Sequence, residues 1–221
     1  MFTISDQKYV IAIDGPGGSG KDTLADNLVK IGFFDPANVK IFNSGNFSRT
    51  IAHELICRNI AVGSVGFNDT AIRAMHEVDF IHVDPKSILT SQVEQVIPAI
   101  AKIPEIRDGF AQKLPDIIQG FDADVLIILG RVIGSLHPQA AVKFYLETSP
   151  DICAHRRAYA RSLNGEDYAT VLQNQKERNK TDITSWDANN SRPEDTFILN
   201  TDNATQQDIL WKALHHLNKV F

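Results

Sequence analysis

Residues Tyr9 to Leu24 read Y-V-I-A-I-D-G-P-G-G-S-G-K-D-T-L, and this segment carries the clearest structural signal in the chain. An apolar run from Val10 to Ile13 leads into a glycine-rich loop, and helical periodicity starts at Lys21. This order predicts a strand, a loop and the first turn of a helix. Gly15, Gly20 and Lys21 fit G-x-x-x-x-G-K, a pattern in which backbone N–H groups, a helix N-terminus and a lysine surround phosphate groups. We therefore expect a triphosphate-binding loop.

The composition restricts the class of protein. The length of 221 residues fits a single domain over residues 1–221. The net charge of −5 argues against general affinity for nucleic acid or anionic membranes. Cys57 and Cys153 lie far apart without metal-ligand spacing, so we expect reduced thiols. No apolar run reaches transmembrane length and no signal-peptide pattern is present, which predicts a cytoplasmic protein. Nothing requires a partner chain, and we expect a monomer.

Strand and helix patterns alternate along the chain. After the first strand, further core strands are predicted at Val39–Phe42, Asp124–Leu129, Val142–Leu146 and Phe197–Leu199, and the alternating segment Val78–Val83 predicts a half-exposed strand. Helices are predicted at Lys21–Ile31, Phe47–Asn59, Ser87–Ile103, Pro104–Ile118, Asp151–Leu163, Asp167–Thr181 and Thr205–Val220, with a turn or two at Ala71–His76. Such alternation predicts an α/β fold with a five-stranded, mostly parallel sheet and helices on both faces.

Polar residues follow three of the predicted strands. Ligands of such sheets bind at the carboxyl ends of the strands. The glycine loop, Ser44 with Arg49, and Gly130 with Arg131 should therefore share one crevice.

A basic segment lies further along the chain. Arginines and lysines supply the charge that phosphoryl transfer needs, and six of them, at positions 156, 157, 161, 176, 178 and 180, predict a basic cover. A solvated helix face is the alternative for these six.

Several segments together resemble one family. They are I-A-I-D-G-P-G-G-S-G-K-D-T-L (11–24), N-S-G-N-F-S-R (43–49), T-S-Q-V (90–93), G-R-V-I-G (130–134), A-H-R-R (154–157) and K-E-R-N-K-T-D (176–182). In this order they are similar to the bacterial cytidylate kinases, a branch of the nucleoside monophosphate kinases. The resemblance implies a three-layer P-loop kinase fold with a short substrate-binding insertion at about 63–86 and a helical lid at about 154–186. It also implies transfer of phosphate from ATP to CMP or dCMP, with UMP as a further acceptor.

The same resemblance assigns roles by position. It implies that ATP is bound by Gly15, Pro16, Gly17, Gly18, Ser19, Gly20, Lys21, Asp22, Thr23, Arg157, Thr201 and Asp202. The acceptor would be bound by Ser44, Arg49, Ser91, Arg107, Arg131, Arg178 and Asp182, and the catalytic charges would be Lys21, Arg131, Arg157 and Arg178. Mg²⁺ would accompany ATP.

Three positions depart from the family pattern. Val132 occupies the place of an aspartate that helps to read the amino group of cytosine. Asp22 follows the loop lysine, where other phosphate-loop proteins have a Mg²⁺-binding hydroxyl, and we expect it to bind the metal. An arginine that ends the family's last basic run is absent near Ser185.

Some residues also fit other classes of protein. Residues 179–182 spell N-K-T-D, the guanine-reading pattern of GTP-binding switches, but they follow a polar helical segment instead of an apolar strand. A P-loop kinase of another small metabolite, and a relative that binds nucleotide without turnover, remain open because of Val132 and Asp22.

Overall fold

The computed structural model describes residues 8–163, 165–173, 176 and 192–221. The chain divides into two compact units. The first, which we call the core unit, runs up to Phe42 and resumes at Ala123, and the second, the inserted unit, is Asn43–Asp122. Each unit is described below by itself.

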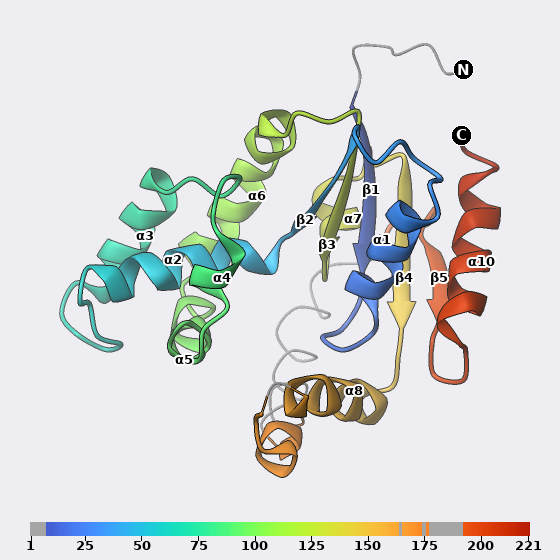
Figure 1. Cartoon of the computed structure of the whole chain (residues 1–221). Coiled ribbons are helices and arrows are strands. Elements are labelled where there is room, and N and C mark those ends of the chain that lie inside the picture. Colours follow the sequence, from blue (N-terminus) through green and yellow to red (C-terminus); the bar gives the residue numbers. More distant parts are fainter. Residues whose placement is uncertain (1–7, 164, 174–175, 177–191) are drawn as a thin grey trace. The chain divides into compact units, whose positions relative to one another are not determined.

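A five-stranded sheet forms the core unit (Figure 1). Its strands are β1 (Tyr9–Asp14), β2 (Val39–Asn43), β3 (Val125–Gly130), β4 (Val142–Glu147) and β5 (Phe197–Asn200), in the order β2-β3-β1-β4-β5. β1 pairs in parallel with β3 and β4, and β4 pairs in parallel with β5. β3 is buried over its whole length, as expected of a strand covered on both faces. The predicted α/β fold with five core strands is confirmed.

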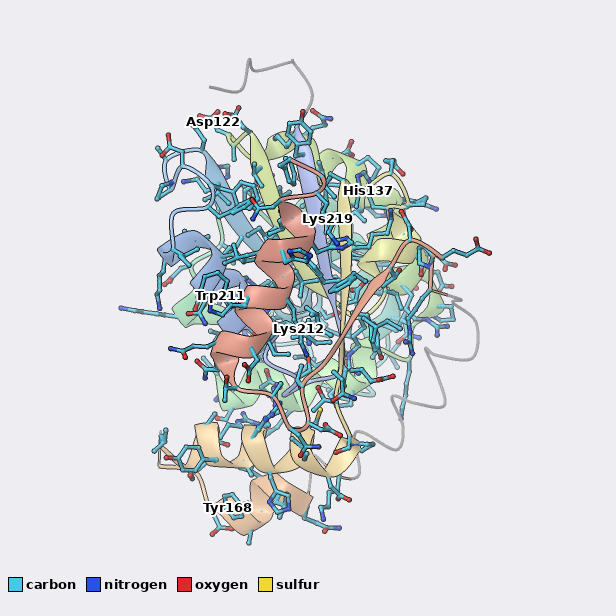
Figure 2. All side chains as sticks on the ribbon, turned by 90° about the vertical axis from the view of Figure 1, so that its right-hand side faces the viewer. Asp122, His137, Tyr168, Trp211, Lys212 and Lys219 are labelled. Carbon is cyan, nitrogen blue, oxygen red and sulfur yellow. The ribbon has the colours of Figure 1, made fainter. Side chains whose placement is uncertain are left out.

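The two faces of the sheet differ in chemistry. Helices α1 (Lys21–Lys30) and α10 (Gln206–Leu217) pack on one face, where Ile13 and Phe144 belong to the apolar core. Trp211 and Lys212 lie on the exposed surface of α10 (Figure 2). Because side chains alternate along a strand, Asp14 and Tyr145 project from the opposite face, which the short helix α7 (Ile133–Leu136) partly covers. That face carries polar groups at the carboxyl end of the sheet.

The inserted unit is helical. It contains α2 (Gly45–Cys57), α3 (Phe67–Glu77), α4 (Pro85–Ile88), α5 (Ser91–Ile100) and α6 (Pro104–Gly120). Phe47 stacks on Phe80 with ring centroids 4.3 Å apart and meets the edge of Phe110 at 5.0 Å. None of the described helices in either unit is both long and apolar enough to cross a membrane.

The strand predicted at Val78–Val83 is wrong. The Asp79 carboxylate accepts hydrogen bonds from the backbone N–H groups of Ile81 and His82. These bonds form a local turn that competes with strand pairing. Phe80 is nevertheless buried, so the apolar alternation marks a packed turn.

The predicted helix boundaries need correction as well. Ser87–Ile103 is not one helix, because α4 ends at Ile88 and Thr90 caps α5, its hydroxyl accepting a bond from the Val93 N–H at 3.2 Å. α3 begins at Phe67, four residues before the predicted helical segment Ala71–His76. Residues 168–173 of the predicted helix Asp167–Thr181 are helical, and most of its remainder lies outside the described residues.

Candidate active site

The glycine loop packs closely against neighbouring backbone. It joins β1 to α1, and Gly18 has φ 94°, in the left-handed region that favours glycine. A Cβ atom on Gly15 would lie 2.7 Å from the carbonyl oxygen of Leu146, and one on Gly18 would collide with the carbonyl of Cys153. The loop therefore tolerates no side chain at either position, which keeps its backbone against β4 and against helix α8 (Pro150–Ser162).

The Lys21 side chain is folded into the loop. Its Nζ donates hydrogen bonds to the carbonyl oxygens of Gly15 and Pro16, each at 2.8 Å. Burial lowers the pKa of Lys21 to about 8, and the nearby charge of Arg131 acts in the same direction. Beside it the Ser19 hydroxyl is buried and has no hydrogen-bond partner among the described residues. An anionic oxygen inside the loop would satisfy both groups.

A cavity of about 620 Å³ opens beside the loop, and we call it the loop cavity. Residues predicted to bind ATP line it, including Gly18, Ser19, Gly20, Asp22, Thr23, Arg157 and Thr201. The predicted ATP residue Asp202 instead accepts a hydrogen bond from the backbone N–H of Ser149 at 2.8 Å. This bond fixes the start of α8, which Figure 1 shows beyond the carboxyl end of β4.

Arg156 lines the loop cavity, whereas the sequence predicted it only as part of the basic cover. Its Nη1 donates to the Thr201 hydroxyl at 3.0 Å and its Nη2 donates to the Thr201 carbonyl at 2.7 Å. The Thr201 hydroxyl also lies 2.7 Å from that of Thr148. Arg156 thus ties α8 to the end of β5, and this pairing presents positive charge to the loop cavity.

Asp14 links the loop to the G-R-V-I-G segment. Its carboxylate accepts hydrogen bonds from the backbone N–H groups of Ile133 and Gly134, both at 2.8 Å. Burial raises the pKa of Asp14 to about 6, even though both N–H bonds and the charge of Lys21 favour the ionised form. The contact holds the start of α7 against the end of β1 and thereby fixes the backbone that carries Arg131.

A second cavity, of about 430 Å³, lies on the α7 side of the sheet. We call it the Tyr145 cavity, and its lining includes Asp14, Arg131, Val132, Tyr145 and Arg192. The guanidinium carbon of Arg192 lies 3.8 Å from the centre of the Tyr145 ring. Adjacent residues of β4 line one cavity each, Tyr145 this one and Leu146 the loop cavity, so the carboxyl end of the sheet lies between the two.

Four predicted acceptor residues belong to the inserted unit. Arg49 pairs with Glu94 through Nε and Oε1 at 3.0 Å, and a Cβ on Gly45 would lie 2.6 Å from its Nη1. Ser44 precedes α2, while Ser91 and Arg107 are exposed on α5 and α6. Their convergence with Arg131 in the core unit stays a prediction. Arg178 and Asp182 lie outside the described residues.

Three residues of this site are not predicted from the sequence as site residues. Asp14 enters the sequence prediction only as part of the loop motif, although a carboxylate at the end of an apolar strand is a usable signal. Tyr145 was assigned only to a strand. Arg192 stands alone in a polar segment, and no local pattern marks it.

A parallel sheet whose first strand runs through a glycine loop into a helix headed by lysine is the fold of the P-loop kinases. The sequence profile described as Cytidylate kinase matches residues 11–219, and the chain belongs to that family. It is therefore a nucleoside monophosphate kinase, a phosphotransferase.

The relatives are distant and cover most of the chain. The cytidylate kinase of Bartonella quintana (strain Toulouse) is 29% identical over 196 residues, covering 87% of this chain and 86% of that protein. That of Acidiphilium cryptum (strain JF-5) is 28% identical and covers 96% of both chains. Among solved structures, shikimate kinase from Bacteroides thetaiotaomicron is 13% identical, with 95% of this chain and 98% of that chain covered and a TM-score of 0.45.

The buried carboxyl of Asp14 predicts a pH-dependent stability difference. A pKa raised from 3.8 to about 6 means that the folded state retains a proton which the unfolded state has lost, so stability falls as pH rises through this interval. Relative to Asp14→Asn, the wild-type protein should lose about 2 kcal/mol of unfolding free energy between pH 4 and pH 6.5. Urea titrations of both proteins across this range measure the difference, with Asp26→Asn, an exposed carboxylate on α1, as the charge control. Parallel pH profiles for the wild type and Asp14→Asn would contradict the assignment.

Proposed function

We propose that this kinase transfers the γ-phosphoryl group of ATP to a pyrimidine nucleoside monophosphate, with CMP or dCMP as the leading acceptor and UMP as a second one. The observation that carries the proposal is the arrangement of two cavities on either side of the carboxyl end of the sheet, with Lys21 in the wall of one and Arg131 in the wall of the other. A phosphoryl donor and an acceptor need such adjoining sites, because the transferred group moves only a short distance between them.

The loop cavity suits the triphosphate of ATP. The loop backbone, the Ser19 hydroxyl and the Lys21 ammonium would surround the phosphates, and the N-terminus of α1 adds unpaired N–H donors. Arg156 and Arg157 from α8 add positive charge to the opposite wall. In the proposed reaction an oxygen of the acceptor phosphate attacks the γ-phosphorus and ADP leaves, while these cations offset the charge that develops.

Magnesium is the expected companion of ATP. Asp22 lines the loop cavity directly after Lys21, where its carboxylate would provide one oxygen ligand. Among the described residues no three carboxylate, histidine or cysteine side chains gather as a complete metal site. Mg²⁺ in kinases is commonly held by one or two carboxylates together with substrate phosphates, so one carboxylate here is sufficient. When bound, the ion would neutralise phosphate charge.

Acceptor choice is proposed to depend on Val132. This residue is 9% exposed and lines the Tyr145 cavity next to Arg131. A valine side chain presents only methyl groups to a base, so it accepts no hydrogen bond from the exocyclic amino group of cytosine. The proposed site therefore discriminates less between cytosine and uracil than one with a carboxylate at this position.

Lys21 should be indispensable for transfer. Lys21→Ala removes the ammonium held inside the loop, and we expect the rate to fall on the order of 100-fold or more, as for other lost transition-state donors. Because the pKa of Lys21 is lowered to about 8, the protonated form is lost as pH rises, and wild-type kcat/KM for ATP should decline above about pH 8. Steady-state kinetics from pH 6 to 10, with circular dichroism to check folding, test both points. A variant that keeps near wild-type turnover would remove the loop from the mechanism.

Asp22 should set the magnesium requirement. Asp22→Ala is expected to raise the Mg²⁺ concentration for half-maximal rate roughly tenfold, because a ligating carboxylate is lost. Asp26→Ala, exposed one turn further along α1, is the matched control and should leave the titration unchanged. The measurement is a Mg²⁺ titration at saturating ATP, supported by Mg²⁺-dependent protection of each protein against thermal unfolding by ATP. Identical titrations for Asp22→Ala and the wild type would leave Asp22 as surface charge.

Val132 should broaden acceptor use. A missing polar contact is worth about 1–3 kcal/mol. The preference for CMP over UMP should therefore be roughly ten- to a hundredfold smaller than in an enzyme with a carboxylate at this position. A coupled assay across all nucleoside monophosphates measures this, and Val132→Asp should sharpen the preference for CMP, whereas Val132→Ala, which adds no hydrogen-bond acceptor, should not. The proposal fails if the wild-type enzyme prefers a purine acceptor or already rejects UMP by more than roughly a thousandfold.

A further inference from the structure

Arg192 is held in the Tyr145 cavity by an aromatic ring. The guanidinium lies 3.8 Å from the centre of the Tyr145 ring, a distance typical of a cation–π stack. Stacking uses the flat face of the guanidinium and leaves its N–H donors at the edge available for a ligand. The ring therefore holds a cation with a defined orientation at the wall of a cavity.

The segment that follows Arg192 is anchored independently. Lys143 in β4 is 4% exposed, and its Nζ donates to Asp195 at 2.6 Å and to the Ala140 carbonyl at 3.1 Å. A buried ammonium is stable only when it is paired in this way. This contact holds the chain three residues after Arg192 against the same face of the sheet, so Arg192 does not depend on its stack alone for its position.

The hydrogen-bond donors around the cavity suit an anionic ligand. Arg131 and Arg192 contribute two guanidinium groups to one lining. The Asp14 carboxylate faces the same space, but both of its oxygens already accept backbone N–H bonds. Glu194 is exposed at the lining and is the carboxylate that opposes the arginines. Paired arginines bind phosphate oxygens through several N–H donors at once.

We propose that Arg192, oriented by the ring of Tyr145, binds the phosphate of the acceptor nucleotide together with Arg131. This inference rests on the proposed function, and it assigns Arg192 and Tyr145 to acceptor recognition. Arg192 contacts the acceptor itself, and Tyr145 is a positioning residue that acts through Arg192. The donor nucleotide is bound in the other cavity and does not depend on either residue.

The test separates acceptor binding from donor binding and from folding. Arg192→Ala should raise KM for CMP roughly 10- to 100-fold, the range for a lost hydrogen bond to a charged group, with KM for ATP and the thermal midpoint unchanged. Arg192→Lys keeps the charge but lacks the planar donors, so its KM for CMP should lie between those of the wild type and Arg192→Ala. Tyr145→Leu removes the ring and should raise KM for CMP about threefold or more, and Tyr145→Phe, which keeps the ring, should lie closer to the wild type than Tyr145→Leu does. Lys212→Ala, an exposed cation on α10 outside both cavities, is the control.

Binding measured without turnover distinguishes the two proposals. If the wild-type enzyme phosphorylates CMP and Arg192→Ala has an unchanged KM for it, the assignment of Arg192 is overturned and the proposed function stands. If no nucleoside monophosphate is phosphorylated, the proposed function fails, and calorimetric titration with CMP still decides about Arg192. CMP binding that weakens at least tenfold in Arg192→Ala supports the site. CMP binding that is equal in both proteins, or absent from the wild type, overturns it.

Discussion

The contact between the Asp14 carboxylate and the backbone of α7 is the constraint on which the site depends. It joins residues 119 and 120 positions apart in the chain, and it lies where β1 ends and the glycine loop begins. Helix α7 consists of only four residues and contacts both β1 and β3. The two bonds to Asp14 fix its first turn against the end of β1, at the wall of the Tyr145 cavity.

This constraint is maintained against an electrostatic penalty. Burial favours the neutral forms of both Asp14 and Lys21, and the pKa values of about 6 and about 8 show how far the two groups have moved from their ordinary values. Their mutual attraction and the backbone N–H bonds keep both charged near neutral pH. The result is a site with opposite charges already in place, in which burial reduces the hydration of the Lys21 ammonium.

The sequence predicted the sheet because its strands carry largely apolar runs, and it predicted the loop because glycine positions and a lysine are local features. It failed where distant or side-chain interactions decide the structure. The segment around Asp79 alternates like a strand, but its carboxylate bonds to the following backbone and forms a turn. Arg192 and Tyr145 are 47 residues apart in the chain, and no local sequence pattern near either residue predicts the stack. The pairing of Arg49 with Glu94, 45 residues apart, was invisible for the same reason.

The two cavities are built from different segments of the chain. The loop cavity draws on α1, α8 and α10, whereas the Tyr145 cavity draws on α7, β4 and residues 192–198. β4 contributes to both, through Leu146 to the loop cavity and through Tyr145 to the Tyr145 cavity. Residues 192–198 line only the Tyr145 cavity, so substitutions there need not disturb the residues around the glycine loop. This separation gives evolution a route to change the ligand of the Tyr145 cavity through a few substitutions, while the glycine loop and its cavity are inherited unchanged.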